Sequence, residues 1–158
     1  MGSVSNIIFG TMTLGYEGYG SRVHDLETAR SMFDAFAAAG YCDVDTADGY
    51  GNGSCEQMLG DLGVAKDFSV ATRFTPLSTP HGHEPDILKH SVRTSLERLR
   101  TGSVAILYLA HRDSGTPLED TLRAVDELHR EGVFGEFSLS NFSAADVQTV
   151  RSICSANR

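Results

Sequence analysis

The sequence predicts an α/β domain built from about five successive βα units. Short apolar segments with strand character alternate with amphipathic segments of helical period, and the strands start near residues 7, 41, 68, 104 and 134. These starts are roughly 30 residues apart, which is the length of a βα repeat. Sequential units of this kind form a parallel sheet with helices outside it. Two architectures satisfy these observations, a doubly wound sheet and part of an eight-stranded barrel.

Each element has its own signal in the sequence. Residues 104–109 are almost continuously apolar, as expected of a strand that is buried on both faces. The first helix should cover residues 25–39, where apolar residues recur at helical spacing and Gly40 supplies a stop. The expected strands are Ile7–Phe9, Tyr41–Asp45, Phe68–Arg73, Val104–Leu109 and Phe134–Leu139. The apolar faces of the later helices contain Met58, Leu59 and Leu62, then Leu88, Val92, Leu96 and Leu99, and finally Val147, Val150 and Ile153.

Two helix starts have capping signals. Before the fourth helix, Thr116 is expected to be the N-cap, with Pro117 at the first helical position and Glu119 at the third. Ser143 is expected to cap the last helix.

Composition indicates a single globular domain, residues 1–158, with 41% hydrophobic and 22% charged residues. The net charge of -8 and the absence of a Lys/Arg cluster argue against nucleic-acid binding. No apolar run is long enough to cross a membrane, so we expect no membrane association. The three cysteines are irregularly spaced, which predicts a reducing, cytoplasmic setting. Cys42 and Cys154 are expected to be buried and Cys55 to lie in a loop.

In both architectures functional sites form at the carboxyl ends of the strands. The polar residues that follow the expected strands are Asp45, Tyr50, Arg73, His111, Arg112, Ser140 and Asn141. A carboxylate, a phenol, a guanidinium and an imidazole at one edge suit proton transfer to a carbonyl oxygen. A tyrosine can donate its proton there if a nearby cation lowers its pKa, and a carboxylate can hold that cation in place.

Several motifs in series resemble the aldo-keto reductases, and among them the branch that reduces aflatoxin-type dialdehydes. The motifs are Phe9-Gly10-Thr11-Met12, Asp43-Val44-Asp45-Thr46-Ala47 with Tyr50, Val70-Ala71-Thr72-Arg73, Leu107-Tyr108-Leu109 and Leu139-Ser140-Asn141. The resemblance implies a (β/α)8 TIM barrel and NADPH-dependent reduction of an aldehyde or ketone, such as a hydrophobic secondary metabolite or xenobiotic. It also implies a catalytic set of Asp, Tyr, Lys and His.

Only part of that catalytic set is carried over. Asp45 and Tyr50 match the family, while Arg73 stands at the lysine position. Ala110 stands at the histidine position and His111 follows one residue late. If the strand stays extended through Ala110, His111 points away from the site.

For the cofactor, the resemblance implies contacts from the backbone of Gly10 and Thr11, from Asp45, and from Ser140 and Asn141, which would bind the carboxamide. Structural alternatives stay open for Arg73 of the catalytic set, which can serve as an ion-pair partner of Asp45, and for the Ser140–Asn141 pair, which can belong to a turn. No metal is expected, because His81 and His83 are expected to lie in a solvated loop that has no larger set of metal ligands.

Five units cannot close an eight-stranded barrel, so the sequence predicts a truncated, partial barrel that is open or is completed by self-association through its free edges. Two other functions stay open. The same residues can serve a non-redox acid–base enzyme, such as an isomerase, cyclase or dehydratase. The chain can also be a non-catalytic remnant or interaction module.

Overall fold

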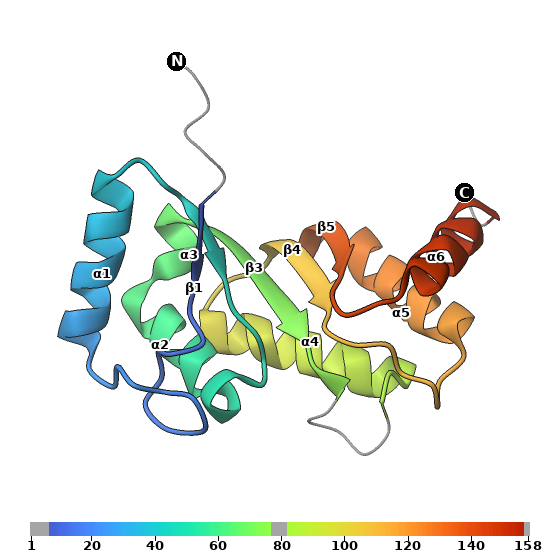
Figure 1. Cartoon of the computed structure of the whole chain (residues 1–158), viewed down its shortest axis with the longest axis horizontal. Coiled ribbons are helices and arrows are strands. Elements are labelled where there is room, and N and C mark those ends of the chain that lie inside the picture. The colour runs from blue at the N-terminus through green and yellow to red at the C-terminus, as the bar shows by residue number, and fades with distance from the viewer. Residues whose placement is uncertain (1–6, 77–81, 157–158) are drawn as a thin grey trace.

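Five parallel strands form one sheet in the computed structural model, which describes residues 7–76 and 82–156 (Figure 1). The strands are β1 (Ile8–Gly10), β2 (Asp43–Asp45), β3 (Ser69–Phe74), β4 (Val104–Leu109) and β5 (Phe134–Leu139). They lie in sequence order, and each adjacent pair is parallel. This order confirms the prediction of successive βα units and excludes a doubly wound sheet, in which the strand order reverses.

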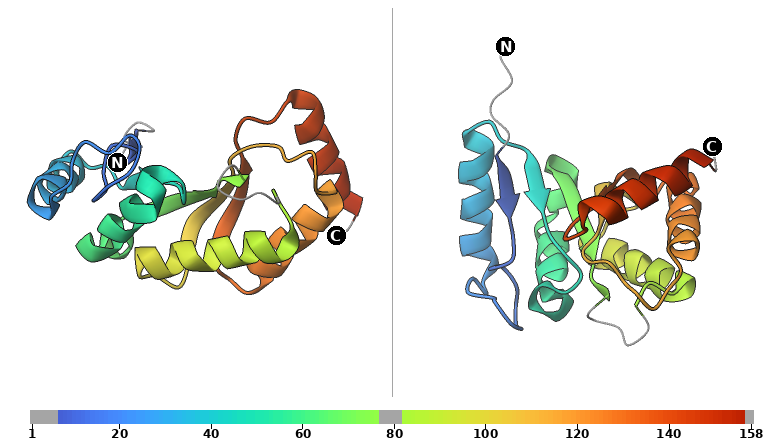
Figure 2. Two further views of the ribbon diagram at one scale, coloured as in Figure 1. Left: turned by 90° about the horizontal axis from the view of Figure 1, so that it is seen from below. Right: turned by 45° about the vertical axis from the view of Figure 1, so that its right-hand side comes forward.

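Helices follow the strands in the predicted alternation. They are α1 (Leu26–Ala38), α2 (Ser54–Leu62), α3 (Val64–Asp67), α4 (Pro85–Leu99), α5 (Leu118–Arg130) and α6 (Ala144–Ala156). A short 3-10 turn, η1 (Tyr50–Gly53), precedes α2. The helices line the outside of the curved sheet, and the inside of the curve is left open (Figure 2).

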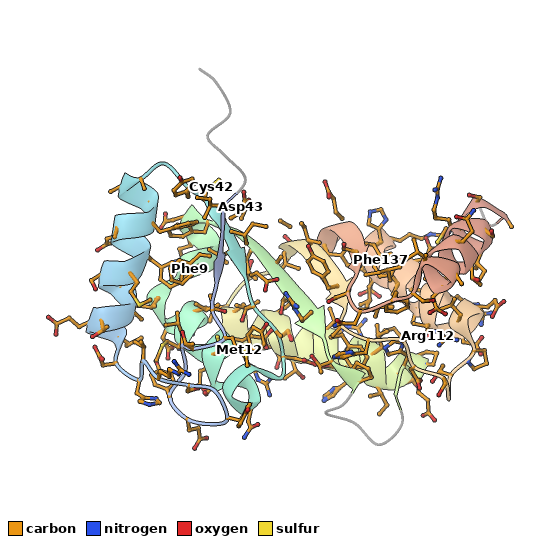
Figure 3. All side chains as sticks on the ribbon, viewed as in Figure 1. Phe9, Met12, Cys42, Asp43, Arg112 and Phe137 are labelled. Atoms are coloured by element: carbon orange, nitrogen blue, oxygen red, sulfur yellow. The ribbon has the colours of Figure 1, made fainter. Side chains whose placement is uncertain are left out.

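The face of the sheet toward the helices, which we call the outer face, contains the main core. Val44 lies beside Val70, and Phe74 lies beside Leu109, in neighbouring strands. All four side chains are at most 3% exposed. On β1, Phe9 packs against Phe33 of α1 with ring centroids 4.9 Å apart (Figure 3). Successive strand residues point to opposite faces, so these residues define which side of the sheet is buried.

The opposite face, which we call the inner face, is the side that a closed barrel would enclose. Its residues are paired across the strands as Ile8 with Asp43, Gly10 with Asp45 and Arg73 with Tyr108. Ile8 is 55% exposed, and Asp43 is exposed at the amino end of β2 (Figure 3). The predicted open barrel segment is therefore what the described residues form.

One of the two predicted helix caps is confirmed. Ser143 lies directly before α6, and its hydroxyl oxygen accepts a hydrogen bond from the amide of Asp146 at 3.1 Å. In return, the Asp146 carboxylate accepts from the backbone amide of Ser143 at 3.3 Å and from its hydroxyl at 2.5 Å. This reciprocal arrangement has the logic of a capping box, with Asp in place of Glu at the third position.

The predicted capping box at Thr116 is wrong. Helix α5 begins at Leu118, and Pro117 takes the cap position with extended backbone and no side-chain cap. The preceding turn instead belongs to Asp113, whose carboxylate accepts from the amides of Gly115 at 2.8 Å and Thr116 at 3.1 Å. A local side-chain turn therefore replaces the expected hydroxyl cap.

The expected burial of the cysteines is also reversed. Cys42 and Cys154 are exposed, while Cys55 is fully buried in α2. Cys55 lies in the first turn of α2 rather than in a loop, and its side chain is directed at the residue that follows β1. There its thiol donates to the carbonyl oxygen of Thr11 at 3.2 Å.

Candidate functional site

A hollow of about 350 Å³ opens on the inner face toward the carboxyl ends of the strands. Its lining combines residues from the strands and the loops that directly follow them: Ile8, Gly10, Asp45, Arg73, Tyr108, Leu139 and Ser140. Sites in α/β barrels form at this end. The hollow contains four of the predicted site residues, namely Gly10, Asp45, Arg73 and Ser140.

Asp45 and Arg73 form the charged centre of the hollow. Nη2 of Arg73 donates to both carboxylate oxygens of Asp45, and each side chain is 22% exposed. Burial opposes the charge on the guanidinium, but the hydrogen bond and the attraction of Asp45 outweigh it and raise the pKa of Arg73. Arg73 is therefore a permanent cation whose position is set by Asp45.

Two aromatic rings flank this guanidinium. The central carbon of Arg73 lies 5.9 Å from the ring centroid of Tyr50 and 5.4 Å from that of Tyr108. Both distances are within the range of cation–π attraction. Nε of Arg73 is buried without a hydrogen-bond partner among the described residues, so stacking, rather than hydrogen bonding, holds that edge of the guanidinium.

Tyr108 is a site residue that the sequence reasoning missed. It lies directly beside Arg73 in the register of β3 and β4, so both side chains belong to the inner face. The signal that points to Tyr108 is the two-residue period of β4, because a strand that places Leu107 and Leu109 in the core must place Tyr108 on the opposite face.

The effect of Arg73 on Tyr50 is smaller than expected. Burial of the half-buried phenol raises the pKa of Tyr50, and the charge of Arg73 lowers it by less. Asp45 adds a further increase. The expectation that a nearby cation brings this pKa below its usual value is therefore wrong, because burial of the phenol raises the pKa by more than Arg73 lowers it, and Asp45 adds to the increase.

The turn that carries Tyr50 is packed against the glycine-rich loop of residues 15–20. Gly51 and Asn52 both have a φ of 54° in η1. A Cβ on Gly51 would come within 2.6 Å of the carbonyl oxygen of Glu17, so only glycine fits here. The hydroxyl of Ser54 donates to the same carbonyl at 2.8 Å. The loop and the turn thus hold each other in place.

Gly10 and Thr11 have different surroundings. Gly10 lines the hollow, and a side chain at its position would meet nothing within 4 Å. Thr11 is fully buried, and both its hydroxyl and its amide donate to the carbonyl oxygen of Asp45, at 2.9 and 3.0 Å. Thr11 therefore holds the end of β2, which carries Asp45.

Ser140 and Asn141 follow β5 directly, and only Ser140 is among the described residues that line the hollow. Ser140 lines it, and its amide donates to the carbonyl of Leu109 at 2.9 Å, which extends the pairing of β4 and β5. Asn141 has a φ of 57°, and its side-chain amide donates to the carbonyl of Ala110 at 2.8 Å. Asn141 thus belongs to the turn, as the structural alternative proposed, while Ser140 stays directed to the hollow.

His111 is not among the described residues that line the hollow. The amide of Ala110 still donates to the carbonyl of Phe74 at 3.0 Å, so the strand pairing continues through Ala110. Ala110 therefore takes the inner-face position after Tyr108, and His111 comes one residue too late. The Tyr50 ring flanks Arg73 but, like His111, is not among the described residues that line the hollow. The structure therefore brings Asp45, Tyr50 and Arg73 together and leaves His111 out of this cluster.

Of the two histidines considered for a metal, His81 lies outside the described residues. For His83 the expectation of a solvated loop is wrong, because its ring is fully buried and packs against Phe74 with centroids 5.5 Å apart. Burial lowers the pKa of His83 to about 4, so the ring is neutral near pH 7. Within residues 7–76 and 82–156, no group of three or more His, Cys, Asp or Glu side chains is placed to hold a metal ion.

In the same part of the chain, every helix is too short or too polar to span a membrane.

Comparison with known proteins assigns this geometry to a family. The chain is 36% identical to human "Aldo-keto reductase family 7 member A3" and 34% identical to human "Aflatoxin B1 aldehyde reductase member 4". Both alignments cover 95% of this chain and 45% of the relative, so the chain spans less than half the length of these relatives.

Solved structures give the same result for the fold. The thermostable aldo-keto reductase Tm1743, determined with the inhibitor epalrestat, superposes with a TM-score of 0.80 at 26% identity, over 92% of this chain and 53% of that one. The holo form of the aldo-keto reductase AKR11C1 from Bacillus halodurans gives a TM-score of 0.75 at 28% identity, over 92% and 49%. Residues 6–156 match the family described as "Aldo/keto reductase family", and the chain therefore belongs to that family.

Proposed function

We propose that this chain contributes the proton-donating part of an NADPH-dependent carbonyl reductase site, with the aldehyde or ketone bound in the inner-face hollow. The observation that supports this most is the cluster of Tyr50, Arg73 and Asp45 at the carboxyl ends of the strands. The similarity to named reductases favours this function over a non-redox acid–base enzyme or a non-catalytic module.

The reaction divides between cofactor and protein. The hydride for the carbonyl carbon would come from NADPH when that cofactor is bound. The phenol of Tyr50 donates a proton to the carbonyl oxygen, and the positive charge of Arg73 stabilises the phenolate that is left. Asp45 keeps Arg73 in place. The phenol is protonated near neutral pH, as a general acid must be, and the charge of Arg73 opposes the effect of burial, which raises the pKa of Tyr50.

The hollow fits the nicotinamide end of the cofactor. Gly10 leaves room for a flat ring, and Ser140 offers a hydroxyl at the rim. In barrel enzymes the phosphates are commonly held by loops after the seventh and eighth strands. The described sheet contains strands β1 to β5, so the chain alone should bind the dinucleotide weakly.

The proposed substrate is a hydrophobic carbonyl compound, such as a secondary metabolite or xenobiotic. Ile8, Tyr108 and Leu139 give the hollow an apolar wall, and the relatives include aflatoxin aldehyde reductases. We also propose a cytoplasmic location, because the three cysteines are unpaired. A second copy is the proposed partner of the open inner face and the free edges of β1 and β5.

The test is the Tyr50→Phe variant, assayed with NADPH at millimolar concentration and 2-carboxybenzaldehyde as a model carbonyl. Loss of the general acid should lower kcat by about 100-fold, the usual contribution of a positioned acid. One oxygen is removed and little volume, so urea unfolding should change little. A variant that keeps full turnover would show that Tyr50 is not the acid. Product formation without NADPH would favour the non-redox alternative.

A further inference from the structure

Asp48 is a buried carboxylate in the loop between β2 and the turn that carries Tyr50. It is 8% exposed and precedes Tyr50 by two residues. Its carboxylate oxygens accept hydrogen bonds from the amide of Thr75 at 3.1 and 3.2 Å, and one of them accepts from the hydroxyl of Ser91 at 3.0 Å. One side chain thus connects the loop after β2, the end of β3 and helix α4.

The backbone of Asp48 adds a second connection to β3. Its amide donates to the carbonyl oxygen of Arg73 at 3.1 Å. Asp48 therefore bonds through its amide to the residue that supplies the cation, and through its carboxylate to Thr75, two residues farther along the chain. The segment 73–75 and the turn that begins at Tyr50 cannot move independently while these bonds persist.

Burying this carboxylate is unfavourable by itself. Burial raises the pKa of the Asp48 carboxyl, and the hydrogen bonds from Thr75 and Ser91 oppose that change only in part. An apolar side chain would avoid this cost, but it could not accept three hydrogen bonds from two different elements. An aspartate at position 48 is therefore better suited to connecting the loop with the end of β3 and with α4 than to filling the core.

The opposite side of the Tyr50 turn is already held by the contact of Ser54 with Glu17. That contact ties the turn to the glycine-rich loop, which contributes no side chain to the described lining of the hollow. The bonds of Asp48 to Arg73 and Thr75 are thus a second attachment of the loop that leads to Tyr50, and this one is on the β3 side, where Arg73 lies.

We propose that Asp48 is a positioning residue of the reductase site, which fixes the turn bearing Tyr50 against the strand end bearing Arg73. This inference rests on the proposed function, because it assigns a purpose to the contact between phenol and guanidinium. Asp48 itself does not line the hollow and is not expected to touch the substrate.

The test measures the ionisation of Tyr50 in the whole chain by ultraviolet phenolate absorbance, with the Tyr50→Phe background subtracted. The groups that act on this phenol are Arg73, Asp45 and Cys55, and all of them stay in each variant. In Asp48→Ala the freed turn should expose the phenol, and the pKa of Tyr50 should fall toward its usual value of 10.0. Asp48→Asn, which can still accept hydrogen bonds, should restore part of the native titration.

Asp113→Ala is the matched control, because Asp113 also accepts bonds from backbone amides but lies in the loop after β4. At a similar loss of stability, this control should leave the titration of Tyr50 at its native value. If Asp48→Ala does not fold, Ser91→Ala removes one of the bonds and should shift the titration in the same direction by less. A native titration in all folded Asp48 and Ser91 variants would overturn the inference.

Measurement of kcat distinguishes a failure of this inference from a failure of the proposed reductase function on which it rests. If both hold, Asp48→Ala lowers kcat while Asp113→Ala does not. A shifted titration together with full activity of Tyr50→Phe would mean that the connection exists but that the proposed function is wrong.

Discussion

The two faces of the sheet are made by the same strands but contain different kinds of side chain. The outer face presents residues such as Val44, Phe74 and Leu107 to the helices, and they are at most 2% exposed. The inner face presents Asp43, Asp45, Arg73 and Tyr108, and it is left open by the described residues. The apolar face accounts for the fold, and the polar face contains the candidate chemistry.

Because of this difference, we expect substitutions that affect stability and substitutions that affect the candidate chemistry to fall on different faces of the sheet. Burial of apolar area against helices stabilises the strands whether or not the inner face is covered. The inner face contributes an ion pair and aromatic contacts whose side chains stay partly exposed, so they add less to stability than the buried apolar contacts do. Changes on the outer face should therefore alter the free energy of unfolding, and changes on the inner face should alter binding, turnover or association.

The largest expected effect is on the outer face. Leu107→Ala removes a side chain that is 1% exposed in the middle of β4 and should lower the free energy of unfolding by about 3–4 kcal/mol. Ile8→Ala removes an inner-face side chain that is 55% exposed and should change it by less than about 0.5 kcal/mol. Urea denaturation measures both. Equal losses would show that the inner face is covered in solution.

Acidic pH should lower the free energy of unfolding, because unfolding allows His83 to bind a proton. Its pKa is about 4 in the folded chain, against a usual 6.5, so the unfolded chain binds more protons between these values. The stability linked to His83 is complete above pH 6.5 and is lost as the pH falls toward 4, by at most about 3 kcal/mol.

Unfolding by urea at a series of pH values, compared with His83→Leu, isolates this effect. The comparison is needed because Asp48 and Glu56 have raised pKa values, which act in the opposite direction. Asp113 faces His83 and has a pKa of about 2, so its own contribution is lost only below pH 3.8. Parallel pH profiles of the two proteins would refute the role of His83.

A smaller effect is expected from Arg73 on the inner face. Arg73→Leu removes the cation beside Tyr50 and should lower turnover of a model carbonyl by at least about tenfold, with a stability change near 1 kcal/mol. Arg73→Lys keeps the charge and the pairing with Asp45 but loses planar stacking on Tyr50 and Tyr108, so it should keep more activity than the leucine variant. Steady-state kinetics in saturating carbonyl decide between these outcomes.

The smallest effect concerns association. The uncovered inner face and the free strand edges should make the chain self-associate at micromolar concentration. Ile8→Glu places a further charge on this face and should shift the chain toward monomer. Light scattering of both proteins measures the masses, and a clean monomer for the unaltered chain would contradict the expectation.

The sequence was sufficient for the features that depend on local pattern. The alternation of strands and helices, the cap at Ser143 and the alignment of Asp45, Tyr50 and Arg73 with family motifs all follow from short segments. Pairing between distant residues was harder to predict. The role of Asp113 depends on amides in two loops, and that of Tyr108 depends on the register of β3 and β4. The pKa of Tyr50 depends on its burial in three dimensions, which no motif encodes.

The central proposal is that Asp45, Tyr50 and Arg73 supply the acid–base chemistry of a reductase site, while the five described strands do not include the seventh and eighth strands, whose loops commonly hold a phosphate group in barrel enzymes. The most direct measurement is a titration of the chain with NADPH, followed by cofactor fluorescence. Hydrogen bonds from Ser140 and its neighbours contribute about 1–3 kcal/mol together, which corresponds to a Kd of millimolar or weaker. We therefore predict no saturation below about 1 mM NADPH. Saturation at low micromolar NADPH would contradict the account and would mean that a second copy of the chain supplies the phosphate site.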